Sequence, residues 1–109
     1  MAIVAVNIVP LGVGTSVSNY VAAAEKVIVD RPGIKRQLGP MFTTLEGDLD
    51  EIMKAVREMQ EAVFEAGADR VMTTIKIDDR RDVKATMEAK LASVNTKLGI
   101  KNPDNVVIP

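Results

Sequence analysis

The chain has 109 residues, of which 47% are apolar and 27% charged, so it has the length of one domain and the composition of a folded, soluble protein. It contains no cysteine and no histidine, which excludes disulfides, thiolate metal sites and the Ser-His-Asp and Cys-His catalytic sets. A net charge of −1 and an aromatic content of 3% give no basis for binding nucleic acid or an anionic membrane, and we expect a cytoplasmic protein.

The first predicted element is a β-strand over residues 3–9, an apolar segment that is rich in β-branched side chains. The segment has no basic leading region, and no apolar run approaches the roughly 18 residues of a membrane span, so we expect neither a signal peptide nor a membrane anchor. After a loop over residues 10–17, Ser18 is the expected N-cap of a first helix. The spacing of apolar residues carries this helix to about Asp30, and Pro32 ends it.

Two short strands follow, over residues 34–38 and 41–46, and the Gly39-Pro40 pair between them indicates a hairpin or a bent connection. A second helix opens at Asp48, where Glu51 completes a capping box, and Gly67 ends it.

The last predicted strand covers residues 70–78, which alternate between two faces. A third helix follows the charged run 78–82, and Gly99 closes it. Its residues expected to face inward are Val83, Met87, Leu91, Val94 and Leu98. We assign residues 1–99 to one domain, and residues 100–109, which include the apolar run 106–108, to a tail or a short added strand.

The order β-α-β-β-α-β-α predicts a ferredoxin-like α+β fold, with a four-stranded antiparallel sheet, two helices on one face and an additional C-terminal helix. We expect the first and third strands to lie at the centre of the sheet and to run parallel to each other, unlike the other strand pairs. The first strand is apolar on both faces, so the second face of the sheet needs a cover. A homo-oligomer supplies that cover most economically.

A ligand site is expected at one rim of this sheet, where parallel central strands would bring the loop 11–18 next to residues 43–46. Glu46 is the leading candidate, because a carboxylate within a strand needs donors, and a ligand amine or amidine can supply them. The alternative is that Glu46 is an exposed acid at the end of a strand, or that it pairs with a neighbouring Lys or Arg.

Other polar residues near this rim are further candidates. Thr43 and Thr44 carry hydroxyls that can donate or accept hydrogen bonds, although alternation sends them to opposite faces. The loop before the first helix can offer N–H groups to an anion, but its glycine spacing does not fit a nucleotide motif, and an ordinary loop is the alternative. The full candidate ligand-binding set is Asn7, Thr15, Ser18, Phe42, Thr43, Thr44 and Glu46.

The charged run over residues 78–82 is expected at the end of the sheet away from Glu46, where it would cap a helix and form ion pairs. A metal or phosphate site is the alternative for this run. We expect no catalytic residue, no metal and no resident cofactor in the chain.

Three segments carry a resemblance to a known family: Ile-Val-Pro-Leu-Gly at 8–12, Gly-Pro-Met-Phe-Thr-Thr-Leu-Glu-Gly-Asp at 39–48, and Thr-Thr-Ile-Lys-Ile-Asp-Asp-Arg-Arg at 73–81. Over residues 4–98 the chain resembles the small thiamine-binding proteins of the YkoF-like superfamily. The resemblance implies a ferredoxin-like fold, dimers or tetramers, binding of thiamine or its hydroxymethylpyrimidine part, and no catalytic activity. Phe42 departs from the small or polar residue of many relatives, and it would either stack on a pyrimidine or close the pocket.

We therefore expect a non-catalytic, homo-oligomeric protein that binds thiamine or hydroxymethylpyrimidine, with Glu46 accepting from the pyrimidine amine. The alternative is an assembly or regulatory module with no functional thiamine site. An acylphosphatase-like hydrolase would share only the fold, which is a poor basis for assigning function.

Overall fold

Strand β1 (Ala2–Leu11) lies at the centre of a four-stranded sheet in the computed structural model, which describes residues 1–105. Its neighbours are β3 (Thr43–Gly47) and β4 (Arg70–Asp78), and β2 (Lys35–Leu38) pairs with the outer edge of β3. The strand order is β2-β3-β1-β4, and every neighbouring pair is antiparallel. The predicted ferredoxin-like α+β fold is confirmed, whereas the predicted tail segment 106–108 lies outside the described residues.

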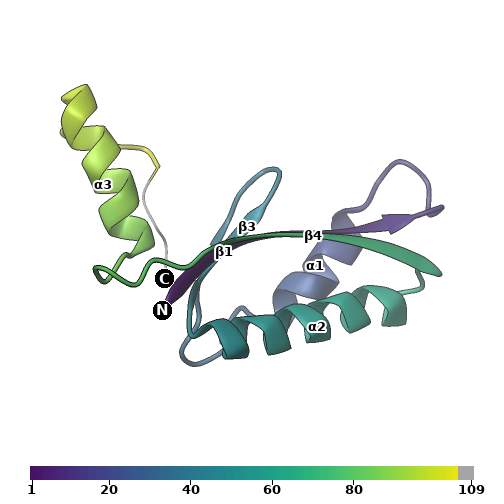
Figure 1. The fold of residues 1–109 in the computed structure, drawn as a ribbon. Helices are drawn as coiled ribbons and strands as arrows, with labels where there is room; N and C mark the ends of the chain where they lie inside the picture. Colours follow the sequence, from purple (N-terminus) through teal and green to yellow (C-terminus); the bar gives the residue numbers. More distant parts are fainter. Residues whose placement is uncertain (106–109) are drawn as a thin grey trace.

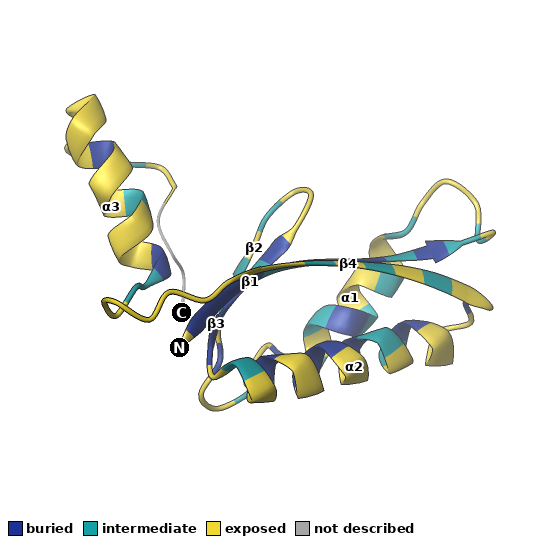
Figure 2. Cartoon of the chain, in the orientation of Figure 1, coloured by how far each residue is buried: buried dark blue, intermediate teal, exposed yellow. Residues whose placement is uncertain are grey.

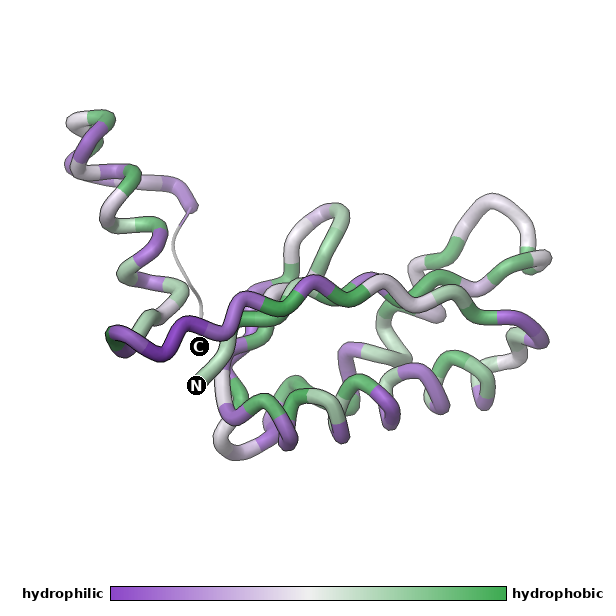
Figure 3. Tube along the Cα trace, viewed as in Figure 1, coloured by the Kyte–Doolittle hydropathy of each residue, from purple (hydrophilic) through white to green (hydrophobic). Residues whose placement is uncertain are grey.

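The core forms between the sheet and two helices, α1 (Ser18–Lys26) and α2 (Leu49–Glu65), which lie on the same face (Figure 1). Alternate residues of β1 point into this layer, including Val4, Val6 and Ile8. Buried residues gather between the two layers (Figure 2), and the apolar side of α2 faces the sheet (Figure 3). The predicted start of α2 is confirmed, because the Asp48 side chain accepts a hydrogen bond from the Glu51 N–H at 3.2 Å.

The expectation that the first and third strands run parallel is wrong. Because β2 and β3 form an antiparallel pair and β1 is antiparallel to β3, each helix connects two parallel strands that are not neighbours in the sheet. Interleaving these two β-α-β units places β1 beside β3 in opposite directions. Consequently Glu46 pairs with Ile3 near the start of β1, and the loop that follows β1 leaves the opposite end of the sheet.

The charged run also lies elsewhere than expected. Ile3 pairs with Glu46 on one side and with Asp78 on the other, so these two acids lie in one row across the sheet. The prediction that the run lies away from Glu46 is therefore wrong. It depended on β3 running parallel to β1, and the two strands are antiparallel.

Helix α3 (Met87–Leu98) stands away from the sheet at one end of the molecule (Figure 1). It begins after the charged run, at Thr86, whose side chain accepts a hydrogen bond from the Ala89 N–H at 3.1 Å, and Gly99 closes it in the left-handed conformation as predicted. Met87 is buried. The inward orientation predicted for Val83, Val94 and Leu98 is wrong, because all three are exposed. Helical periodicity identifies the apolar side chains of a helix but not the surface that covers them.

The face of the sheet opposite α1 and α2 carries Ala5, Asn7 and Val9 of β1, with Met72 of β4 beside Val9. Met72 is exposed, and the three β1 residues are partly exposed. Among the described residues, no helix combines the length and apolar character that crossing a membrane requires.

Candidate functional site

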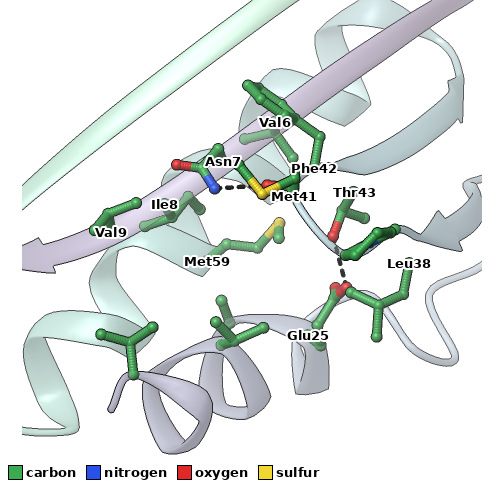
Figure 4. A pocket seen from close by; sticks show the side chains of 15 residues that line it. Val6, Asn7, Ile8, Val9, Glu25, Leu38, Met41, Phe42, Thr43 and Met59 are labelled. Carbon is green, nitrogen blue, oxygen red and sulfur yellow. Dashed lines mark hydrogen bonds between the residues drawn. The ribbon is translucent and has the colours of Figure 1, made fainter. Parts of the chain in front are cut away.

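A cavity of about 190 Å³ lies where β1 continues past the end of β3. The two strands pair only as far as Val6 and Thr43, so the edge of β1 that faces β3 is free from Asn7 onward. The turn between β2 and β3 and the helix α1 enclose the space beside this free edge (Figure 4). The lining residues are Val6, Asn7, Ile8, Val9, Val17, Val21, Ala24, Glu25, Leu38, Gly39, Pro40, Met41, Phe42, Thr43 and Met59.

The turn between β2 and β3 is held in place by two hydrogen bonds. The Gly39 N–H donates to the Phe42 carbonyl oxygen at 2.9 Å, and the Asn7 side-chain amide donates to the Met41 carbonyl oxygen at 2.8 Å. A Cβ atom on Gly39 would lie 2.6 Å from the Phe42 oxygen, so only glycine fits this position without displacing the turn. Asn7 thus fixes one wall of the cavity to β1.

Glu25 supplies the only acidic group of the cavity lining among the described residues. It lies one helical turn from Val21 and from Ile28, on the side of α1 that packs against the sheet. Its Oε1 accepts a hydrogen bond from the Thr43 hydroxyl at 2.7 Å (Figure 4). Its Oε2 is buried without any hydrogen-bond partner, a condition that no other buried side-chain polar atom shares in residues 1–105.

The rest of the lining is mostly apolar and contains no Lys or Arg within the described part of the chain. Met59 of α2 and Leu38 lie near the Thr43–Glu25 pair, and Met41 and Phe42 lie at the turn (Figure 4). Both turn side chains are exposed. The arrangement suits a small, flat, largely apolar group that presents hydrogen-bonding atoms toward Thr43 and Glu25.

Three of the predicted site residues, Asn7, Phe42 and Thr43, lie together in this cavity lining. Thr44 does not, because it points to the opposite face of the sheet, beside Ala5. Thr15 is exposed in the loop after β1. Ser18 is not the N-cap of α1, since Val17 occupies that position without a side-chain hydrogen bond, and Ser18 borders a separate shallow groove along α1.

Glu46, the leading candidate, lies on the other face of the sheet from the cavity. It is 3% exposed, and its Oε1 accepts a hydrogen bond from the Met87 backbone N–H at 2.6 Å. The carboxylate therefore occupies the N-terminal end of α3, where backbone N–H groups and the helix dipole favour negative charge. The alternative expectation for Glu46, an exposed acid or a partner of Lys or Arg, is wrong, because the residue is buried and forms no ion pair within residues 1–105.

Sequence reasoning missed Glu25. The available signal was an acidic residue at a position that helical spacing assigns to the buried side of α1, between Val21 and Ile28. An acid at such a position needs a partner or a function.

The charged run forms ion pairs, as expected, but the prediction that it caps the third helix is wrong, because the N-cap of α3 is Thr86. Arg81 pairs with Asp79 at 3.2 Å, and the hydrogen bond from Arg80 lowers the pKa of Asp82 below its usual value. Lys90 of α3 donates to Asp78, which lowers the pKa of Asp78. Among the described residues, no group of three or more His, Cys, Asp or Glu side chains is placed to hold a metal ion.

The chain matches known proteins along most of its length. A family model described as thiamine-binding protein matches residues 4–95. The UPF0045 protein YqgV of Bacillus subtilis is 46% identical over 102 residues, which cover 90% of this chain and 98% of the relative. A UPF0045 protein of Methanothermobacter thermautotrophicus is 46% identical over 94 residues, which cover 84% of this chain and 94% of the relative.

Two solved structures extend the comparison to the fold. The hypothetical protein MJ1052 of Methanocaldococcus jannaschii superposes with a TM-score of 0.79 at 44% identity, over 86% of this chain and 96% of its own. A Thermotoga maritima protein provisionally assigned to thiamine biosynthesis or salvage superposes with a TM-score of 0.73 at 28% identity, over 85% of this chain and 97% of its own.

Proposed function

The chain belongs to the thiamine-binding protein family, and we propose that it is a non-catalytic binding protein for thiamine or for its hydroxymethylpyrimidine part. The observation that carries the proposal is the cavity beside the free edge of β1, which combines an apolar lining with the polar Thr43–Glu25 pair. Such a combination of apolar walls and a few placed polar groups is typical of small-molecule sites.

The size of the cavity favours the pyrimidine as the part that is buried. Its volume of about 190 Å³ is below the roughly 300–1,000 Å³ of sites that enclose drug-sized ligands. One six-membered ring would occupy the space, and the thiazolium ring of thiamine would extend past the turn that carries Met41 and Phe42. Phe42 belongs to the cavity lining at this turn, which supports a contact between its aromatic ring and the part of the ligand that lies at the rim.

We also propose that the protein works as a homo-oligomer. Val9 and Met72 lie side by side on the sheet face that α1 and α2 leave uncovered. Val94 and Leu98 of α3 are exposed as well. A second copy is the simplest cover for such apolar surface, because exposed apolar patches in monomers are usually small.

Isothermal titration of the purified chain with thiamine and with hydroxymethylpyrimidine tests the binding proposal. We expect saturable heat with one ligand per chain and a melting temperature that rises with ligand concentration. No heat and no thermal shift at millimolar concentrations of either compound would contradict it.

A further inference from the structure

The Glu25 carboxylate is held in an unfavourable place. It is the second-to-last residue of α1, where the negative end of the helix dipole disfavours an anion. Its Oε2 is shielded from solvent and accepts no hydrogen bond, and no cation pairs with it among residues 1–105. Buried polar atoms are nearly always partnered in folded proteins, so an atom in this state indicates a partner that the chain itself does not supply.

Thr43 fixes which oxygen remains available. Its hydroxyl donates to Oε1 at 2.7 Å and joins α1 to the first residue of β3. The carboxylate is therefore oriented before any ligand enters, and Oε2 is left as an acceptor at the polar end of the cavity. A preorganised acceptor of this kind is matched by an N–H donor and is left unpaired by a group that cannot donate.

The charge of the cavity lining also favours a ligand that donates hydrogen bonds over an anionic ligand. The described lining holds one carboxylate and no Lys or Arg, so an anionic group inside the cavity would face Glu25 without a counter-charge. A neutral amine or a protonated ring nitrogen would instead form a charge-assisted hydrogen bond.

We infer that Glu25 is the residue that recognises the ligand, with Oε2 accepting a hydrogen bond from the exocyclic amino group of a single-ring, amino-substituted nitrogen heterocycle. The inference deepens the proposed function and rests on it for the identity of the ligand. It makes the amino group the basis of selection, so that the same ring without this group, or one with a phosphate in its place, binds more weakly.

The test compares two ligands and three proteins by isothermal titration. The ligands are 4-amino-5-hydroxymethyl-2-methylpyrimidine and the same compound without the amino group. The proteins are the wild-type chain, Glu25→Gln and Glu65→Gln, a matched control that removes the same charge from an exposed residue at the end of α2. We expect wild type and Glu65→Gln to bind the amine alike, and Glu25→Gln to bind it about 10- to 100-fold more weakly. The compound without the amino group should bind wild type more weakly by a similar factor.

A second probe separates this inference from the proposed function. Chemical shifts of the α1 and β3 amides are followed by NMR while 2-aminopyridine, a ring amine unrelated to thiamine, is added to wild type and to both variants. Equal binding of the two pyrimidines to wild type, or equal binding of the amine to Glu25→Gln and Glu65→Gln, would overturn the role of Glu25 and leave the proposed function standing. Binding of 2-aminopyridine that depends on Glu25, without any binding of either pyrimidine or of thiamine, would uphold the role of Glu25 and contradict the proposed function. No binding of any of these compounds would overturn both.

Discussion

The Glu46 carboxylate accepts a hydrogen bond from the Met87 backbone N–H at 2.6 Å, across 41 positions of the chain. This contact joins the end of β3 to the first turn of α3, a helix that otherwise stands away from the sheet. Lys35 of β2 donates to Glu88, and Lys90 donates to Asp78 of β4, so the first turn of α3 is tied to three strands by charged side chains. The acid predicted to bind a ligand thus positions a helix in this structure.

Replacing Glu46 by Ala should loosen α3. The substitution leaves the Met87 N–H without its acceptor, and loss of a buried, charge-assisted hydrogen bond lowers the free energy of unfolding by about 1–3 kcal/mol. Chemical denaturation measures this loss, and hydrogen exchange should become faster at the start of α3. Glu65→Ala, which removes an exposed acid at the end of α2, should change stability by no more than about 0.5 kcal/mol. If the Glu46→Ala protein stays folded but binds thiamine more weakly than wild type, Glu46 takes part in binding, and the role given to it here is contradicted.

Acid should release α3 before it unfolds the core. The hydrogen bond from Lys35 lowers the pKa of Glu88 from its ordinary 4.5, and the hydrogen bond from Lys90 lowers the pKa of Asp78 from 3.8. A carboxyl group whose pKa is lowered by folding stabilises the folded state above its ordinary pKa, and that contribution is lost as the pH falls through the lowered value. Heteronuclear NMR relaxation should therefore show residues 87–98 becoming mobile below about pH 4.5 while α2 stays rigid. An α3 that is equally ordered at pH 7 and pH 3 would contradict the role given to these ion pairs.

Replacing Thr43 by Val should destabilise the empty protein, since it removes the hydroxyl that donates to Glu25 and leaves the second carboxylate oxygen without a partner. We expect the free energy of unfolding to fall by about 1–3 kcal/mol, as measured by urea denaturation. Thr43→Ser, which keeps the hydroxyl, should retain most of the stability, and Thr74→Val, on the uncovered face of β4, should have little effect. Equal stability of the Thr43→Val and Thr74→Val proteins would show that the hydroxyl does not hold Glu25 in place.

A charge on the uncovered sheet face should disrupt the proposed oligomer. Met72→Lys places an ammonium group beside Val9, where burial in an interface would cost several kcal/mol. Sedimentation velocity should show a smaller species for this variant than for wild type. Val29→Lys, at an exposed apolar residue just beyond α1, should leave the assembly unchanged. A wild-type chain that sediments as a monomer, or a Met72→Lys protein of unchanged size, would contradict this surface as the interface.

Local signals in the sequence were enough to place several elements of this fold. Asp48 and Glu51 mark the start of α2 through a side-chain hydrogen bond that involves only neighbouring residues, and the alternation of residues 70–78 matches β4. The direction of β1 relative to β3 was predicted wrongly, because it depends on how two β-α-β units interleave and not on any property of either strand. That one error placed the loop after β1 beside the Glu46 end of β3, whereas the cavity lies at the Thr43 end.

The candidate site residues also differ in whether local sequence signals or the packed fold determine their surroundings. Thr43, a candidate because of its place in a strand, and Phe42, a candidate because it departs from the family pattern, both lie in the cavity lining. Glu46 is buried, and its partner is a backbone group on a distant helix that no local pattern specifies. Glu25 was overlooked because one acid among apolar positions leaves helical periodicity intact, and only the packed structure shows that one of its oxygens lacks a partner.

A crystal structure of the chain with 4-amino-5-hydroxymethyl-2-methylpyrimidine tests the central claim most directly. We expect the ring in the cavity between β1, α1 and the β2–β3 turn, with the amino nitrogen at roughly 2.7–3.2 Å from Glu25 Oε2. Density for the ligand beside Glu46 or on the uncovered sheet face, with the cavity empty at saturating ligand, would contradict it.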